Sequence, residues 1–336
     1  MPHTRRRLLH AGGIVIVSTP SMVYMAEEAY RGLSPQFEKG AVSFGEISFK
    51  DFSRGEVKPV VECNVRMKHV YLFYDFNRDF SRDLAVLCLI LSAIIDAGAD
   101  RITLVVPFIP FLRQDRKDRS RVPISAKVAI QMIAHFGNTP HVITLDMHSP
   151  QIEAAFPKAP DHLPGHVIFA PWVRRTFGTE LNKVVIVGPD YGSDKRVELL
   201  AKVIGCTSAC FSKHRDGATV SMGELHGADV RGKICIVNDD ILDTCGTMEK
   251  AADALRRLEA EAIYLTGTHA VFGGDAYTRL ARTGCQVVVT DSLRTHAYPW
   301  LTVLPLAPYL KEAIYQNNIA DGSVSHLINH GLSNQH

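Results

Sequence analysis

The order of β-rich runs and helical patterns along this chain restricts its fold more than any other feature. Strand-like apolar runs occupy 14–17, 70–74, 102–108, 183–187, 234–237 and 263–266, and helix-like segments occupy 84–96, 199–204 and 248–258. Alternation of this kind predicts parallel sheets with helices on both faces. In such sheets ligands bind beyond the carboxyl ends of the strands.

A weak internal echo predicts two similar α/β domains. The sequences AGADRITLVVPF at 97–108 and LEAEAIYLTGTH at 258–269 share the order of helix, small residue, acid and strand. A chain of 336 residues is long enough for two domains that each bury a core. The proline-rich segment PKAPDHLPG at 157–165 is the predicted connection. We therefore expect one domain at 1–160 and a second at 161–336.

The charge balance and the hydropathy pattern argue against two classes of partner. The chain has 37 basic and 35 acidic residues, so no global field would attract nucleic acid or an anionic membrane. The longest apolar run, 84–95, is bounded by Asp83 and Asp96. This run is well short of the roughly 20 residues that span a bilayer. It predicts a buried helix, with neither membrane nor nucleic acid among the partners.

The cysteines favour a reducing compartment. Seven cysteines are scattered through the chain without the paired spacing of a metal site. Reduced thiols and a cytoplasmic location are therefore expected.

The decapeptide NDDILDTCGT at 238–247 is the strongest indication of a ligand site. It follows a strand-like run and precedes a helical pattern, so it lies at a helix N-terminus. Unpaired N–H groups and the positive end of the helix dipole favour an anion there. Thr244, Cys245, Gly246 and Thr247 can surround a phosphate with backbone amides and hydroxyls.

Acidic residues precede this turn and suit a sugar. Asp239 and Asp240 are placed to accept hydrogen bonds from the vicinal hydroxyls of a ribose. Helix capping would explain Asp243 or Thr244 alone, but it would not explain all five polar positions. The decapeptide therefore predicts a site for a sugar phosphate.

This decapeptide resembles the phosphoribosyl-diphosphate binding motif of type I phosphoribosyltransferases and of phosphoribosyl-diphosphate synthetases, also called ribose-phosphate diphosphokinases. The run PFIPFLRQDRKDRSRVPISAK at 107–127 is similar to a synthetase signature that ordinary phosphoribosyltransferases lack. Further similarities follow in family order, from about residue 14 to about residue 328: FSRGE at 52–56, DMHSPQIEAAF at 146–156, VGPDYG at 187–192, SKHR at 212–215 and THAVFGG at 268–274.

The resemblance implies a fold and a reaction. The expected fold is α/β, with two tandem phosphoribosyltransferase-like domains, each a mainly parallel sheet flanked by helices. The expected reaction transfers the diphosphoryl group of ATP to the 1-hydroxyl of ribose 5-phosphate, which gives phosphoribosyl diphosphate and AMP. The resemblance also implies a homo-oligomer, a dimer or larger, in which neighbouring chains complete the ATP site.

Two cations match the family's catalytic pair. Lys213 and Arg215 match a lysine and an arginine of a flexible loop that closes over the transferring phosphates. The residues alone predict a mobile loop after the strand-like run 208–211, because FSKHRDGATVSMGEL is polar and rich in breakers. Without the resemblance these cations would be solvated loop charges. His214 stands where the family usually has another arginine.

The remaining site assignments also rest on the resemblance. The ATP-binding residues it implies are Arg54, Gly55, Glu56, Arg113 and Gln114. A triphosphate requires Mg²⁺, and the metal positions it implies are His148 and Asp190. Arg54 replaces a common acid, and Ser193 replaces a common glycine.

Cys245 stands where the family commonly has alanine or glycine. Because a helix N-terminus lowers the pKa of a thiol, we expect the thiolate of Cys245 to be favoured in the empty site. Ribose 5-phosphate would then protect Cys245 from alkylation.

Three alternatives to this enzyme follow from the residues. The departures at Arg54, Ser193 and His214 would suit a non-catalytic relative that binds and regulates an active synthetase, although Lys213 and Arg215 are retained. A phosphoribosyltransferase that consumes the diphosphate would leave the RQDRK segment unexplained. A diphosphokinase that uses another pentose phosphate is compatible with every motif.

Overall fold

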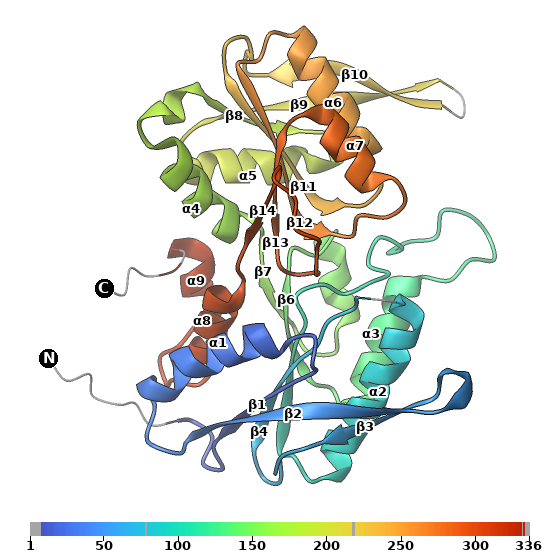
Figure 1. The fold of residues 1–336 in the computed structure, drawn as a ribbon, viewed down its shortest axis with the longest axis vertical. Helices are drawn as coiled ribbons and strands as arrows, with labels where there is room; N and C mark the ends of the chain where they lie inside the picture. Colours follow the sequence, from blue (N-terminus) through green and yellow to red (C-terminus); the bar gives the residue numbers. More distant parts are fainter. Residues whose placement is uncertain (1–7, 78, 217–218, 331, 333–336) are drawn as a thin grey trace, which may run out of the picture. The chain divides into compact units, whose positions relative to one another are not determined.

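The computed structural model describes residues 8–77, 79–216, 219–330 and 332, apart from the side chains of 213–222 and 330. The chain forms two compact units. Unit 1 contains the residues up to Leu163 and those from Leu306 onward, and unit 2 contains Pro164–Pro305. Figure 1 shows the fold of each unit.

Unit 1 is built on a sheet with the strand order β3-β2-β1-β4-β5-β6-β7. Its strands are β1 (Ile14–Ser18), β2 (Val42–Asp51), β3 (Val57–Val61), β4 (His69–Phe73), β5 (Arg101–Val105), β6 (His141–Leu145) and β7 (Asp161–Leu163). Its helices are α1 (Val23–Leu33), α2 (Phe80–Asp96), α3 (Ser125–Phe136), α8 (Ala307–Gln316) and α9 (Val324–His330). Within this unit, α1 and α8 lie on one side of the sheet and α2 and α3 on the other (Figure 1).

Unit 2 repeats this topology, with the strand order β10-β9-β8-β11-β12-β13-β14. Its strands are β8 (Val184–Gly188), β9 (Thr207–Asp216), β10 (Thr219–Gly227), β11 (Ile234–Leu242), β12 (Ala262–Ala270), β13 (Gln286–Thr290) and β14 (Leu301–Leu304). Its helices are α4 (His166–Phe177), α5 (Asp194–Ile204), α6 (Gly246–Arg257) and α7 (Ala276–Thr283). Helices α4 and α5 lie together, and so do α6 and α7 (Figure 1).

The predicted fold class is confirmed. All strand pairs are parallel except β2 with β3 and β9 with β10. The central strands are runs of valine, isoleucine and leucine because parallel strands are buried on both faces. All five residues of β8 are buried, for example.

One strand of each sheet extends beyond its inner neighbour and forms a hairpin arm. The pairing of β1 with β2 ends at Ser18 and Glu46, and the rest of β2 pairs with β3. In unit 2 the pairing of β8 with β9 ends at Gly188 and Cys210, and the rest of β9 pairs with β10. Each arm is therefore a two-stranded ribbon that continues the sheet.

The second arm corrects the loop predicted around Lys213 and Arg215. The backbones of both residues lie on β9, opposite Met222 and Val220 of β10. Antiparallel pairing satisfies the backbone of this polar segment, so the breaker-rich composition did not prevent strand formation. The register shifts between Met222 and Leu225, near Gly223, which is a usual place for glycine in a strand.

The C-terminal segment belongs to unit 1, whereas the sequence-based range 161–336 placed it in the second domain. Helix α8 lies against α1. After α8, the buried side chain of Asn318 donates hydrogen bonds to the Tyr71 hydroxyl and to the Ile314 carbonyl, both at 2.7 Å. Neighbouring Asn317 donates to Asp161 at 2.6 Å. The two asparagines hold the segment to β4 and β7, contacts that local sequence patterns do not reveal.

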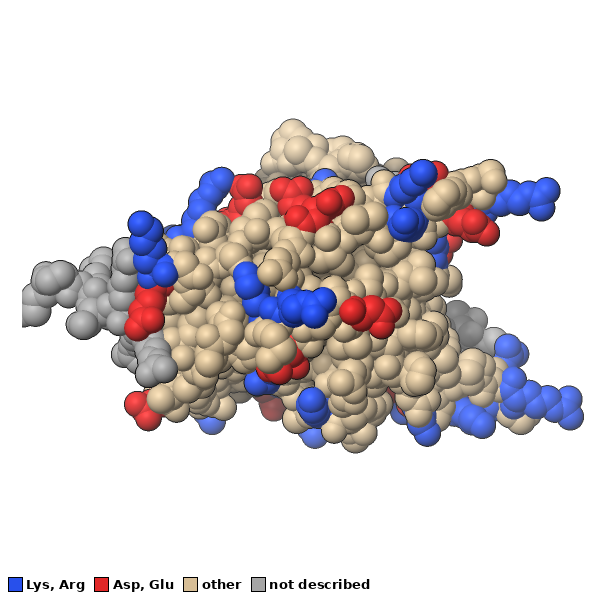
Figure 2. Space-filling view, turned by 90° about the horizontal axis from the view of Figure 1, so that it is seen from below, with Lys and Arg blue, Asp and Glu red and all other residues tan. Residues whose placement is uncertain are grey.

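Charge and hydropathy can be compared with the structure. On the face that Figure 2 displays, basic and acidic side chains both occur in small groups on a mainly uncharged surface. In the part of the chain that the structure describes, no helix combines the length and apolar character required to cross a membrane.

We predict that Asn318→Ala destabilises unit 1. The substitution leaves the buried Tyr71 hydroxyl and the Ile314 carbonyl without this donor, which should cost about 2 kcal/mol. Calorimetry should show a thermal midpoint several degrees lower. Asn182→Ala, the same change at an exposed position, should leave the midpoint almost unchanged; equal effects of the two variants would contradict this role.

Candidate active site

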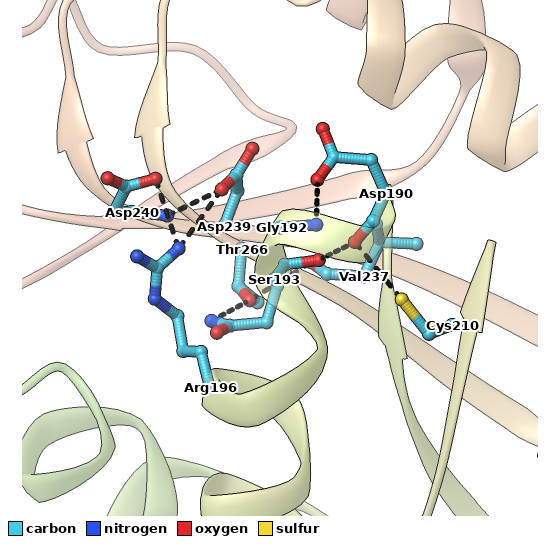
Figure 3. A network of polar contacts seen from close by, with 10 residues as sticks. Asp190, Gly192, Ser193, Arg196, Cys210, Val237, Asp239, Asp240 and Thr266 are labelled. Carbon is cyan, nitrogen blue, oxygen red and sulfur yellow. Dashed lines mark hydrogen bonds and ion pairs between the residues drawn. The ribbon is translucent and has the colours of Figure 1, made fainter. Parts of the chain in front are cut away.

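The carboxyl end of β11 forms the centre of the candidate site. Strand β11 lies between β8 and β12, parallel to both, and continues through Asp239 and Asp240 before the turn into α6. Figure 3 shows both carboxylates reaching the same guanidinium, that of Arg196 on α5. The structure therefore brings the two predicted acids together with a cation.

The guanidinium of Arg196 fixes the acidic pair. Its Nη1 donates to Oδ1 of Asp239 at 3.1 Å and to Oδ1 of Asp240 at 3.0 Å. The backbone N–H of Asp240 also donates to Oδ1 of Asp239 at 2.9 Å. No sequence motif pointed to Arg196 as a site residue. Its position on the helix that follows β8, the parallel neighbour of β11, was the signal that could have found it.

Burial and mutual repulsion act on the acidic pair. The side chain of Asp240 is 5% exposed and that of Asp239 is 26% exposed. Burial and the neighbouring Asp240 carboxylate raise the pKa of Asp239 well above its ordinary value, and Arg196 opposes this shift. A ligand that donates hydrogen bonds to the pair would favour the charged carboxylates.

A buried hydrogen-bond chain supports the strand beneath the acids. The Asn238 side-chain amide donates to Oγ1 of Thr266 at 2.9 Å, and the Thr266 hydroxyl donates to the Val237 carbonyl at 3.1 Å. Both side chains are almost fully buried. This chain joins β11 to β12, so it fixes the register directly before the acids.

The predicted phosphate turn lies between β11 and α6. Asp243 and Gly246 are half-buried, whereas Thr244 and Thr247 are exposed. Cys245 has φ of 60° and makes no side-chain cap on α6. The first N–H groups of a helix have no partner within it, so this turn can offer backbone donors to an anion.

The prediction of a reactive thiolate at Cys245 is wrong. The side chain is turned into the core and is 5% exposed, and its thiol donates to the Asp243 carbonyl at 3.5 Å. Burial, followed by the charges of Asp243 and Asp239, raises the pKa of Cys245 to about 12, against a smaller opposing effect of Arg279. Desolvation exceeds the helix-terminus effect because the sulfur faces apolar atoms.

Asp190, a predicted metal position, lies after β8 in unit 2. Its Oδ1 accepts a hydrogen bond from the Gly192 N–H at 2.8 Å. Its carbonyl accepts from the Ser193 hydroxyl at 2.6 Å and from the Cys210 thiol at 3.0 Å (Figure 3). Ser193 is buried, so its hydroxyl stabilises this turn where the family commonly has glycine.

His148, the other predicted metal position, lies in unit 1 after β6 and is exposed. The preceding residue is fixed, because the Met147 N–H donates to Nε2 of His162 at 3.0 Å. Nδ1 of His162 is 3.0 Å from a carboxylate oxygen of Glu153. Among the described residues, no group of three or more histidine, cysteine, aspartate or glutamate side chains could hold a metal ion.

The predicted ATP-binding residues lie on two separate loops of unit 1. Arg54, Gly55 and Glu56 are exposed at the tip of the first hairpin arm. Arg113 and Gln114 are exposed between β5 and α3, where the Ser125 hydroxyl donates to the Gln114 side chain at 2.6 Å.

The predicted catalytic residues lie on the second arm, in unit 2. Lys213 and Arg215 have backbones within β9. Their side chains lie outside the part of the chain that the structure describes. Their catalytic assignment therefore stays a prediction.

Comparisons with known proteins agree on one family. The family model for the N-terminal domain of ribose phosphate pyrophosphokinase matches residues 14–137. The model for the phosphoribosyl transferase domain matches residues 169–301. Together the two models cover most of the chain.

Curated proteins and a solved structure extend this similarity. The chain is 34% identical to a ribose-phosphate pyrophosphokinase of Listeria ivanovii over 301 residues, which cover 88% of this chain and 93% of that protein. It is 35% identical to ribose-phosphate pyrophosphokinase 2 of Enterococcus faecalis, over 75% of this chain and 78% of that protein. The crystal structure of the phosphoribosylpyrophosphate synthetase of Mycobacterium smegmatis is similar with a TM-score of 0.79 and 26% identity, over 91% of this chain and 99% of that chain.

We predict that Cys245 resists alkylation whether or not ribose 5-phosphate is present. Cys206 is half-buried with a pKa of about 11, and Cys245 is buried with a pKa of about 12. Mass spectrometry after iodoacetamide treatment should show Cys245 labelled about tenfold more slowly than Cys206, or slower still. Labelling should rise with pH without levelling off below the pKa. Fast labelling of Cys245 that ribose 5-phosphate prevents would contradict this prediction and would support an exposed thiolate at Cys245.

We predict that Asp239→Asn stabilises the protein at neutral and higher pH. The raised pKa means that Asp239 contributes stability below its unfolded pKa of about 4 and loses it as pH rises through the folded pKa. Asparagine avoids this loss, so the free energy of unfolding should exceed that of the parent by about 1 kcal/mol near pH 8.

Urea denaturation across this pH range measures the effect. The difference between Asp239→Asn and the parent should shrink toward about pH 4, where the parent carboxyl is protonated. Asp253→Asn, at an exposed acid of α6, is the matched control and should show little difference. A constant difference at every pH would contradict the titration of Asp239.

Proposed function

The chain belongs to the ribose-phosphate pyrophosphokinase family, and from this premise we propose how its residues carry out that family's reaction. The protein is an enzyme that transfers the diphosphoryl group of ATP to the 1-hydroxyl of ribose 5-phosphate. Its products are phosphoribosyl diphosphate and AMP. The observation that carries this function is the Asp239–Asp240 pair, held by Arg196 directly before the N-terminus of α6.

The sugar is bound by the end of β11 and the turn that follows. Asp239 and Asp240 accept hydrogen bonds from the ribose hydroxyls, and Asp243 lies beside them. Thr244 and Thr247 donate hydroxyl hydrogen bonds to the 5-phosphate. The backbone N–H groups of Cys245 and Gly246 complete its cradle. The 1-hydroxyl then remains available for reaction.

The transfer step requires alignment and charge neutralisation. The oxygen of the 1-hydroxyl forms a bond to the β-phosphorus of ATP and loses its proton. The bond between that phosphorus and the oxygen bridging to the α-phosphorus breaks, and AMP leaves with that oxygen. Lys213 and Arg215 neutralise the charge that develops on the transferring group.

The nucleotide is bound by the exposed loops of unit 1. Arg113 offers a planar guanidinium that can stack on adenine or contact a phosphate. Gln114, Gly55 and Glu56 supply hydrogen bonds, and Arg54 supplies a second cation. Because Arg54 and Arg113 lie on separate loops, we propose that a second copy of the chain completes the ATP site. The exposed Phe49 and Phe52 on the first arm support such an interface.

The described residues fit Mg²⁺ held mainly by the phosphates. This ion prefers oxygen ligands, and it commonly takes one or two protein ligands together with phosphate and water oxygens. Asp190 presents a carboxylate at a strand end of unit 2, and the family resemblance assigns exposed His148 of unit 1 as a further metal position. When bound, Mg²⁺ screens the triphosphate and polarises its oxygens.

The seven free thiols support a cytoplasmic location for the enzyme.

We predict that AMP release from ATP and Mg²⁺ depends on ribose 5-phosphate. Lys213→Ala and Arg215→Ala should each lower kcat by about 100-fold or more, because each removes a cation that stabilises the transition state. Lys202→Ala, at an exposed lysine of α5, is the matched control and should retain parental kcat.

The same assay distinguishes the alternatives. Chelation of Mg²⁺ should abolish AMP release. A parent protein that releases no AMP, with Mg²⁺ and ribose 5-phosphate both present, would contradict the proposed reaction and favour a non-catalytic relative. Preference for a different pentose phosphate would keep the reaction and change the acceptor.

A further inference from the structure

Arg279, on α7, lies beside the first residue of α6. A Cβ atom placed on Gly246 would be 3.1 Å from Nη1 of Arg279. The guanidinium therefore occupies the space that a side chain at position 246 would need. Arg279 and the predicted phosphate turn are neighbours, although they belong to different helices.

The charge of Arg279 is only partly balanced by its acidic partner. Its Nη1 is 3.5 Å from Oε2 of Glu249 in the first turn of α6. Nη2 of Arg282 is 2.9 Å from the other carboxylate oxygen, Oε1. Two guanidinium groups therefore share one carboxylate, so Glu249 alone does not neutralise both cations.

One donor of Arg279 has no acceptor in the described part of the chain. Its Nε is shielded from solvent and has no hydrogen-bond partner there. A shielded donor without an acceptor opposes folding, so its retention needs an explanation such as a functional role for this side chain. The side chain as a whole is 36% exposed, so a ligand can reach its exposed part, which does not include the shielded Nε.

The field of Arg279 extends to the turn itself. Burial and then the charge of Asp243 raise the pKa of Cys245, and Arg279 is the group whose charge lowers this pKa. Cys245 and Gly246 are the centre of the phosphate cradle proposed above. An anion bound there would experience the same cation.

We propose that Arg279 binds the 5-phosphate of the sugar substrate and thereby selects phosphorylated over unphosphorylated pentoses, an inference that rests on the proposed function. A phosphate dianion provides oxygen acceptors for both the helix N–H groups and a planar guanidinium. Glu249 positions the guanidinium through their ion pair. An unphosphorylated pentose would leave this cation without its ligand.

The test compares Arg279→Gln with Arg282→Gln. Both variants remove a cation paired with Glu249, but only the first removes the group next to Gly246. In the AMP-release assay, Arg279→Gln should raise the KM for ribose 5-phosphate about tenfold or more, because a charge-assisted hydrogen bond is lost. Its kcat and its KM for ATP should stay within about twofold. Arg282→Gln should leave all three values within the same limit.

A second variant, Arg279→Lys, ensures that the test does not depend on a single substitution. It keeps the charge and loses the planar fork, so its KM for ribose 5-phosphate should lie between those of the parent and Arg279→Gln. Thermal midpoints of all variants establish that they fold. A fall in kcat without a change in KM for ribose 5-phosphate would overturn the proposal, and so would equal KM values for Arg279→Gln and Arg282→Gln.

A direct binding measurement separates this proposal from the proposed function. If the parent releases no AMP, the proposed function fails, and calorimetric titration with ribose 5-phosphate and with ribose then tests Arg279 alone. The parent should bind the phosphorylated sugar more tightly than ribose, and Arg279→Gln should lose most of this preference. An unchanged preference would overturn the role of Arg279.

Discussion

The contact of one guanidinium with two neighbouring carboxylates is the interaction on which the candidate site depends. Adjacent acids in a largely buried place repel each other and lose hydration, so the pair needs a cation. Arg196 supplies it, with one nitrogen 3.1 and 3.0 Å from the two aspartates. Asp239 also accepts the backbone N–H of Asp240. The pair is thus held in a fixed position, which would lower the entropic cost of the sugar binding proposed for it.

The parallel topology explains why this guanidinium is available. Strands β8 and β11 are neighbours with the same direction, so the turn after β8 and the acids near the end of β11 lie at one edge of the sheet. Helix α5 begins from the turn after β8 and brings Arg196 to the acids. Unit 1 repeats the strand order, but Tyr74 and Asp75 follow the corresponding strand β4. A shared fold therefore carries different chemistry in its two copies.

The sequence predicted the parallel sheets and the turn before α6 because both follow from local patterns. It missed contacts that depend on how distant segments fold together. The pairing of Arg196 with the acids is one such contact, and the attachment of residues 306–336 to unit 1 is another. The predicted thiolate at Cys245 was wrong. Its position at a helix N-terminus can be read from the local sequence, whereas its burial depends on the surrounding core. The segment around Lys213 was predicted to be a loop because it is polar. It forms part of β9 instead, because its pairing with β10 outweighs the effect of polar composition.

Within unit 2, the sheet supports the predicted sugar-binding residues and the predicted catalytic residues unequally. The acids and the phosphate turn belong to the interior of a sheet, where β11 has neighbours on both sides. Beyond Cys210, β9 has only β10 beside it, and a two-stranded ribbon is marginally stable without further contacts. A supported turn suits ground-state binding of the sugar phosphate. The proposed roles of Lys213 and Arg215 on this ribbon would be interactions made only during transfer, and it is such interactions that raise kcat.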